Sequence, residues 1–245
     1  MSERTALITG AGRGIGASIT RLLANDIRQL VVHYGSNPAP AVALVDELRE
    51  TGVKAIALRA DISNESAVID LFDQIEMEFG GLDVVVQNAG INSEGLCCVA
   101  DLSIEEYDRL HLTNNRGAFL VLREAARRVR DNGRIIALST TLNRIHSPGF
   151  AGYASSKGVI DHLVPIMAKE LAEKGITVNA VAPSAVDTEL FRAGKSEQQI
   201  EAITQAQPMK RVGLPEDIAP MIQFLASPES GWISGQIIGA NGALA

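Results

Sequence analysis

A glycine-rich turn joins a short apolar run to a helical pattern near the start of the sequence. Residues 5–9 form the apolar run, Gly10-x3-Gly14-x-Gly16 follows, and Ile19, Leu22 and Leu23 recur at helical spacing. Glycines allow a tight turn and let a phosphate approach the free N–H groups at a helix N-terminus. We therefore expect a strand–turn–helix unit that binds a dinucleotide. An ordinary connecting loop is the alternative.

Six more apolar runs follow, and helical patterns separate them. The runs occupy residues 29–34, 53–58, 82–86, 133–138, 177–182 and 235–239. This alternation predicts an α/β fold with a doubly wound parallel sheet and helices on both faces. Polar residues after each run would meet at the carboxyl edge of the sheet, where such folds bind ligands. Without a linker or repeat in the sequence, we expect one domain over residues 1–245.

Composition narrows the classes of partner. The chain is 46% hydrophobic and its formal net charge of −7 is spread without a long run of one sign, which disfavours nucleic acid and anionic membranes. The four histidines are scattered and the only cysteines, Cys97 and Cys98, are neighbours, so we expect no metal site and no disulfide. The sequence shows neither a leader segment nor an apolar run of membrane-spanning length, and we expect a cytoplasmic protein.

Tyr153 and Lys157 are four residues apart in a helical pattern, so they lie on one side of the helix. A nearby ammonium favours the phenolate, and we expect the pKa of the tyrosine to fall from about 10 toward neutrality. Such a group exchanges a proton with an alcohol or carbonyl oxygen. Taken alone, the pair also fits a half-buried tyrosine beside a solvated lysine.

The end of the second strand bears on the choice of cofactor. An acidic residue there would bind the ribose 2′-hydroxyl and repel a 2′-phosphate. The segment Tyr34-Gly35-Ser36-Asn37 has no acid; Ser36 and Asn37 offer polar donors, and Arg13 supplies a cation from the first turn. We therefore expect NADP(H) to be preferred over NAD(H). Ser36 and Asn37 also fit a role in capping the next helix, and the two roles are compatible.

Together these motifs resemble the short-chain dehydrogenase/reductase family over essentially the whole chain. The residues that carry the resemblance are Thr9-Gly10-x3-Gly14-Ile15-Gly16, Asp61-Ile62, Asn88-Ala89-Gly90, Asn114, Tyr153-x3-Lys157 and the stretch from Pro183 to Thr188. The Tyr-Gly-Ser-Asn segment is similar to NADPH-using members such as 3-oxoacyl-carrier-protein reductases. The resemblance implies a Rossmann-like sheet of seven parallel strands and a homo-oligomer, a tetramer or dimer.

The resemblance also implies catalytic roles. Tyr153 donates a proton to the substrate carbonyl as hydride arrives, Lys157 lowers the pKa of Tyr153 and holds the nicotinamide ribose, and Asn114 helps seat a relay water. The family's substrate-orienting serine falls at Thr140, which keeps the hydroxyl, while Ser139 would need a register shift to replace it. The expected catalytic residues are thus Asn114, Thr140, Tyr153 and Lys157.

Motif and resemblance together name a cofactor-binding set. The residues are Gly10, Arg13, Gly14, Ile15, Gly16, Tyr34, Ser36, Asn37, Asp61, Ile62, Asn88, Ala89, Gly90, Tyr153, Lys157, Pro183, Val186 and Thr188. The polar segment from about 189 to 214 follows a strand end, and we expect it to form a mobile lid over the site.

Three functions are compatible with these features. The first is an oxidoreductase that transfers hydride between NADP(H) and a small carbonyl or secondary alcohol substrate. The second is a non-catalytic NADP(H)-binding sensor. Two departures from the family pattern would permit it: Thr140 replaces a serine, and Ser184 replaces the glycine that usually follows Pro183. The third, an epimerase or dehydratase, is disfavoured by the length of the sequence. The substrate and the direction of reaction stay open.

Overall fold

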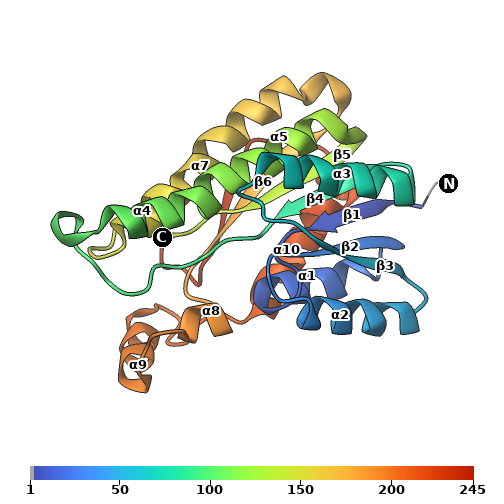
Figure 1. Cartoon of the computed structure of the whole chain (residues 1–245). Helices are drawn as coiled ribbons and strands as arrows, with labels where there is room; N and C mark the ends of the chain where they lie inside the picture. The colour runs from blue at the N-terminus through green and yellow to red at the C-terminus, as the bar shows by residue number, and fades with distance from the viewer. Residues whose placement is uncertain (1–2) are drawn as a thin grey trace.

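A seven-stranded parallel sheet forms the centre of the computed structural model, which describes residues 3–245 (Figure 1). The strands are β1 (Thr5–Ile8), β2 (Gln29–Tyr34), β3 (Lys54–Arg59), β4 (Leu82–Gln87), β5 (Val129–Leu138), β6 (Thr177–Pro183) and β7 (Ile237–Ala240). Their order is β3-β2-β1-β4-β5-β6-β7, so the sheet grows in opposite directions from β1. This topology confirms the predicted doubly wound, Rossmann-like fold, and ligands bind at such a reversal.

Helices cover both faces of the sheet. The longer helices are α1 (Gly14–Leu23), α2 (Ala39–Glu50), α3 (Glu65–Phe79), α5 (Ala118–Arg128), α7 (Ala151–Glu170) and α10 (Pro215–Ala226). Figure 1 shows α1, α2 and α10 on one face and α3, α5 and α7 on the other. Neighbouring strand residues point to opposite faces, so Leu7 packs in one core and Ile8 in the other. Burial on both faces explains the continuous apolar runs.

Local sequence sets the ends of α3. The Asn64 side chain accepts a hydrogen bond from the backbone N–H of Ala67, which caps the first turn. At the other end Gly80 adopts φ 73°, and its N–H bonds to the carbonyl of Glu76. Glycine is favoured there because a side chain would strain this left-handed conformation.

A π-helical segment, η2 (His111–Gly117), interrupts the rod formed by α4 (Ile104–Leu110) and α5. Ser103 caps the start of this rod, and its hydroxyl accepts from the N–H of Glu106 at 3.2 Å. The π-helical turn itself was not predicted. Such turns are rare and often occur at functional sites, and this one carries Asn114 into the interior.

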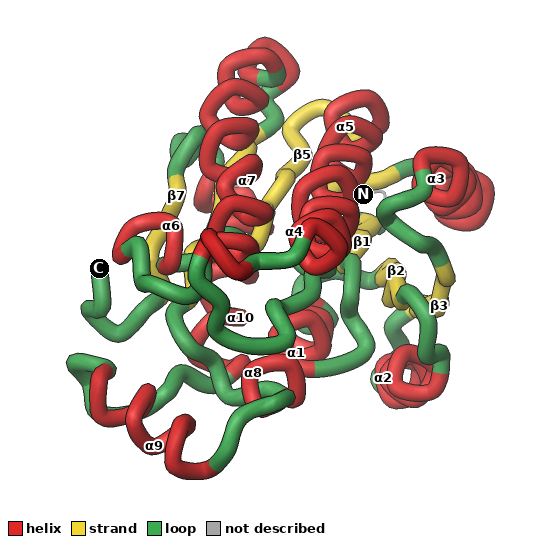
Figure 2. The backbone as a smooth tube through the Cα atoms, turned by 60° about the vertical axis from the view of Figure 1, so that its left-hand side comes forward, coloured by secondary structure: helices red, strands yellow, loops and turns green. Residues whose placement is uncertain are grey.

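The predicted lid contains two short helices, α8 (Glu189–Arg192) and α9 (Glu197–Ala206). Figure 2 shows both outside the helical layers. Val186 and Gly213 form a parallel bridge, and Gly213 donates to the carbonyl of Ala185 at 2.8 Å while its own carbonyl accepts from Asp187 at 2.8 Å. The segment is therefore fastened at its base. Ile200 is the one buried residue of α9.

None of the helices between residues 3 and 245 is both long enough and apolar enough to cross a membrane.

Replacing Thr9 tests the junction of β1 and β4. Its buried hydroxyl accepts from the backbone N–H groups of Asn88 and Ala89, both at 3.0 Å. Thr9→Val keeps the shape but leaves both donors without this acceptor, so we expect the free energy of unfolding to fall by about 1–3 kcal/mol. Urea denaturation measures the change. Thr9→Ser keeps the hydroxyl and should lose less; equal losses would contradict the role of the hydroxyl.

Candidate active site

The turn after β1 is shaped by its glycines. Gly10 and Gly14 have φ values of 62° and 54°, which other residues adopt only with strain. A Cβ on Gly16 would lie 2.4 Å from the carbonyl oxygen of Gly10, so only glycine fits there. Arg13 precedes α1 and gives no side-chain cap, which leaves the N–H groups of the first turn, including that of Ile15, as donors. This cradle fits the pyrophosphate of a dinucleotide.

The end of β4 braces this turn. The Asn88 side chain donates to the carbonyls of Thr9 and Gly10 at 2.9 and 3.0 Å, and the hydroxyl of Thr9 holds the next backbone N–H, that of Ala89. Gly90 follows at the point where β4 leaves the sheet. The structure thus brings the predicted glycine turn and the predicted Asn88-Ala89-Gly90 segment together.

The predicted ribose-reading residues lie at the end of β2. Tyr34 is half-buried and Ser36 and Asn37 are exposed. Asn37 Oδ1 accepts from the N–H of Ala39, so its amide group starts α2 and keeps Nδ2 as a donor. A Cβ on Gly12 would lie 3.1 Å from the backbone nitrogen of Ala41, which places the first turn directly against the start of α2. Arg13 therefore belongs to the same neighbourhood.

Arg59 is a second cation at this end of the sheet, and sequence reasoning missed it. It ends β3 opposite Tyr34, and its Nε donates to the carbonyl of Gly35 at 3.2 Å. Its guanidinium thus borders the segment that holds Ser36 and Asn37. The available signal was a cation as the last residue of β3. Recognising it required the register of β3 against β2, which the sequence does not give.

His33 is a buried brace beneath the glycine turn. Its Nδ1 accepts from the N–H of Gly10 at 3.1 Å, so Nε2 carries the proton and donates to the carbonyl of Ala60 at 3.0 Å. Burial lowers the pKa of His33 to about 4, although the bond to Ala60 opposes the shift. The ring is therefore neutral near pH 7 and ties the first turn to the end of β3. No pattern in the sequence around His33 indicated these contacts.

Asp61 and Ile62 lie between β3 and α3. Asp61 Oδ1 accepts from the backbone N–H and the hydroxyl of Ser63 at 2.9 and 2.7 Å, which fixes the turn. Ile62 is buried against Gly117, where a Cβ would lie 2.8 Å from the isoleucine Cγ1. The residues predicted to contact adenine are thus packed against η2.

Asn114 joins η2 to the end of β4. Its Oδ1 accepts from the N–H of Ile91 at 2.8 Å, and its Nδ2 donates to the carbonyl of Ile91 and to the hydroxyl of Ser156 at 2.9 and 3.0 Å. A Cβ on Gly90 would lie 3.0 Å from this Oδ1 and 3.8 Å from the Nζ of Lys157. The lysine ammonium is therefore next to the amide of Asn114 and the backbone of Gly90.

Thr140, and not Ser139, lies beside Tyr153. The hydroxyl of Thr140 is close enough to that of Tyr153 to act on its pKa, and it accepts from the N–H of Leu142 at 3.3 Å. Ser139 turns away from it, since its hydroxyl donates to Asp161 on α7 and accepts from Asn143 at 3.4 Å. The carboxylate of Asp161 also accepts from Asn143 at 3.0 Å. The two adjacent hydroxyls after β5 thus have different partners.

Burial controls the titration of Tyr153 and Lys157. It raises the pKa of Tyr153 to about 12, and the neighbouring Thr140 hydroxyl only partly opposes this shift. It lowers the pKa of Lys157 to about 8, against the opposing charge of Asp161. The expected fall of the tyrosine pKa is therefore wrong here, because burial removes the solvation of the phenolate and the nearby lysine does not reverse that loss. Near pH 7 the phenol is neutral and most of the ammonium is charged.

The end of β6 closes the remaining side of the site. The carbonyl of Pro183 accepts from the N–H of Thr141 at 2.9 Å, and Val186 is buried. Thr188 Oγ1 caps α8 by accepting from the N–H of Phe191 at 3.1 Å. A Cβ on Gly14 would lie 3.1 Å from Thr188 Cγ2, so the start of the lid touches the glycine turn. Residues 3–245 contain no cluster of side chains suited to a metal ion.

Known proteins resemble this chain along almost its full length. A family model described as enoyl-(acyl carrier protein) reductase matches residues 10–244. Versicolorin reductase stcU of Emericella nidulans is 43% identical over 99% of this chain and 96% of its own. A short-chain type dehydrogenase/reductase of Picea abies is 40% identical over 99% and 92%. The crystal structure of the angucycline C-6 ketoreductase LanV with bound NADP has a TM-score of 0.91 at 30% identity, over 98% and 95%.

The fold, the site and these relatives define an oxidoreductase of the reductase type. The chain belongs to the short-chain dehydrogenase/reductase family, which confirms the resemblance found in its motifs.

Replacing Asp161 tests the charge environment of Lys157. Asp161→Asn removes the carboxylate that opposes the burial effect, so we expect the pKa of Lys157 to fall further below about 8. A titration of the lysine ammonium by NMR measures the shift. Ser139→Ala is the control, because it removes a hydrogen bond to Asp161 but leaves the charge. An unchanged lysine pKa in Asp161→Asn would exclude this electrostatic coupling.

Proposed function

We propose that this protein reduces the carbonyl group of a small ketone or aldehyde with NADPH as the hydride donor. The observation that carries the proposal is the placement of the Thr140 side chain beside Tyr153, one helical turn from the buried Lys157. Two hydroxyl groups that meet beside a buried ammonium supply donors for a carbonyl oxygen. The reductase names of the relatives support the same reaction type.

Tyr153 acts as the general acid in this proposal. When bound, NADPH supplies the hydride to the carbonyl carbon. Tyr153 is neutral at pH 7, so it can give its proton to the carbonyl oxygen as negative charge develops there. Thr140 donates a second hydrogen bond to that oxygen, and fixed donors of this kind stabilise the transition state. A neutral phenol favours reduction over the reverse reaction, which needs a phenolate.

Lys157 and Asn114 support the proton transfer. The ammonium of Lys157 stabilises the phenolate once the proton has left, and it also binds the nicotinamide ribose. Its pKa of about 8 keeps it charged near neutral pH and allows it to return a proton. Asn114 holds the ammonium side of the site in place through three hydrogen bonds, and we assign it the role of seating a water that relays protons.

The cofactor residues favour NADP(H) over NAD(H). The cradle at residues 10–16 receives the pyrophosphate, and Ser36, Asn37, Arg13 and Arg59 surround the place of the 2′-phosphate. No acidic side chain occurs in the β2–α2 loop of residues 35–38. LanV, a relative in structure, binds NADP. The nicotinamide is assigned to the opposite end, between Pro183, Val186 and Thr188.

A second copy of the chain is the expected partner. The outer faces of η2, α5 and α7 expose Leu112, Phe119 and Ile166 by 50%, 41% and 52%. Apolar side chains on neighbouring helices suit burial against another copy. We therefore propose a homodimer or homotetramer, which light scattering after size exclusion would measure.

A non-catalytic NADP(H) sensor is the competing function. Oxidation of NADPH with a panel of β-ketoesters, diketones and quinones separates the two. Tight binding of NADPH without turnover of any carbonyl would favour the sensor.

Tyr153→Phe tests the general acid. The variant keeps the ring but cannot donate a proton, so we expect turnover to fall by at least about 10²–10⁴-fold. The dissociation constant for NADPH should change little, and fluorescence titration measures it. Tyr107→Phe, a half-exposed tyrosine on α4, is the control and should retain activity. Turnover that survives in Tyr153→Phe would exclude the proposed role.

Arg59→Ala tests the 2′-phosphate site. A charge-assisted hydrogen bond to phosphate contributes about 1.5–3 kcal/mol, so we expect NADP⁺ to bind about ten-fold more weakly or worse, and NAD⁺ to bind as before. Arg28→Ala, just before the opposite end of β2, is the matched control and should affect neither. Equal weakening of both cofactors by Arg59→Ala would point to a distorted loop and not to a lost phosphate contact.

A further inference from the structure

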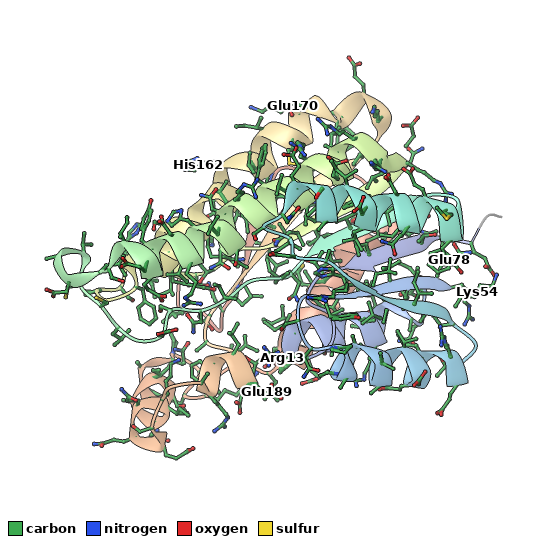
Figure 3. All side chains as sticks on the ribbon, in the orientation of Figure 1. Arg13, Lys54, Glu78, His162, Glu170 and Glu189 are labelled. Carbon is green, nitrogen blue, oxygen red and sulfur yellow. The ribbon has the colours of Figure 1, made fainter. Side chains whose placement is uncertain are left out.

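An ion pair joins the glycine turn to the lid. Arg13 Nη1 lies 2.9 Å from Glu189 Oε2, and the two residues are 176 positions apart in the sequence. Arg13 directly precedes α1, and Glu189 is the first residue of α8. Figure 3 labels both side chains, which lie together where α8 passes the start of α1. The residue assigned to the 2′-phosphate is therefore already paired with a carboxylate.

The pair lies next to a direct contact between the lid and the glycine turn. The side chain of Thr188 packs on Gly14, where a Cβ would lie 3.1 Å from Thr188 Cγ2. The other acids near the start of the lid have a different cation, because Arg192 pairs with Asp187 and lies 3.6 Å from Glu197. Among the ion pairs of residues 3–245, Glu189 has Arg13 alone. The pair is thus a specific link between the cofactor turn and α8.

The link is weak enough to exchange. The two side chains are 65% and 75% exposed, and such pairs contribute about 0–1 kcal/mol. A 2′-phosphate carries more charge than a carboxylate and forms strong bidentate hydrogen bonds with a guanidinium. Arg13 therefore gains by leaving Glu189 for the phosphate, whereas a cofactor without that phosphate leaves the pair intact.

We propose that Glu189 is a specificity-determining residue that competes with the 2′-phosphate of NADP(H) for Arg13. The inference rests on the proposed binding of NADP(H), and it gives the lid a role in the choice of cofactor. Because coupling is reciprocal, a phosphate that breaks the pair loosens α8, and the pair weakens NADP(H) binding by the same factor. The pair does not oppose NAD(H) in this way. Glu189 therefore reduces the preference for NADP(H) over NAD(H). Loss of its ion pair also couples binding of the 2′-phosphate to the lid.

A double-mutant cycle measured by titration calorimetry tests this competition. In Glu189→Gln, NADP⁺ should bind about two- to five-fold more tightly, the factor that corresponds to a surface ion pair of up to about 1 kcal/mol. NAD⁺ should bind as in the wild type. In Arg13→Ala the gain should vanish, so that adding Glu189→Gln changes nothing further. Glu197→Gln, another exposed acid of the lid, is the control and should move neither affinity.

Hydrogen exchange supplies a second readout that does not depend on turnover. NADP⁺ should speed exchange in α8 of the wild type relative to NAD⁺, and Glu189→Gln should remove that difference. The wild type could prefer NADP⁺ while Glu189→Gln leaves the affinity for NADP⁺ unchanged or lowers it. That result would overturn the competition and leave the proposed function standing. A wild type without any preference for NADP⁺ would overturn both the cofactor assignment and this inference.

Discussion

The hydrogen bonds between the ends of β1 and β4 hold the two halves of the sheet in register where its order reverses. The buried hydroxyl of Thr9 accepts two backbone N–H groups, and the Asn88 amide returns two bonds to the carbonyls of Thr9 and Gly10. These contacts leave little freedom to the glycine turn or to Gly90. The glycine turn, proposed to bind a pyrophosphate, and the backbone beside Lys157 are therefore fixed by one polar junction.

The same burial that makes this junction rigid also sets the chemistry of the site. Desolvation raises the pKa of Tyr153 and lowers that of Lys157, and it is the largest cause of both shifts. Burial thus moves the two pKa values apart and favours the neutral form of each group. Asp161 limits the shift of the lysine, and it is itself held by Ser139 and Asn143. The ammonium keeps its charge near pH 7 because a carboxylate is placed one helical turn away.

The sequence was sufficient for the fold because buried parallel strands are apolar runs, and glycines such as Gly10 mark where they end. The family resemblance pointed to Thr140 for the orienting hydroxyl, and the structure places Thr140 beside Tyr153 while Ser139 bonds to Asp161. The contacts of His33 and Arg59 could not be predicted, because they depend on the register of β2 against β3. The prediction of the tyrosine pKa was wrong for a related reason. Spacing along a helix shows that Lys157 is near Tyr153, but only the packing of the fold shows how far the phenol is removed from solvent.

Strand ends and loops hold different parts of the candidate site. Asn88 ties the glycine turn to the end of β4, whereas the loops that follow β4 and β5 meet through a bond from the N–H of Cys97 to the carbonyl of Gly149 and through Leu96. The segment predicted to form the lid is fastened at Val186 and Gly213, and it contacts the glycine turn through Thr188 and an exposed ion pair. Under the proposed reaction, substitutions in these loops would change the substrate range without disturbing the sheet. The proposed proton donor, Tyr153, would keep its place on α7 while the loops around it vary, which would suit a reaction defined by its carbonyl group and not by the rest of the substrate.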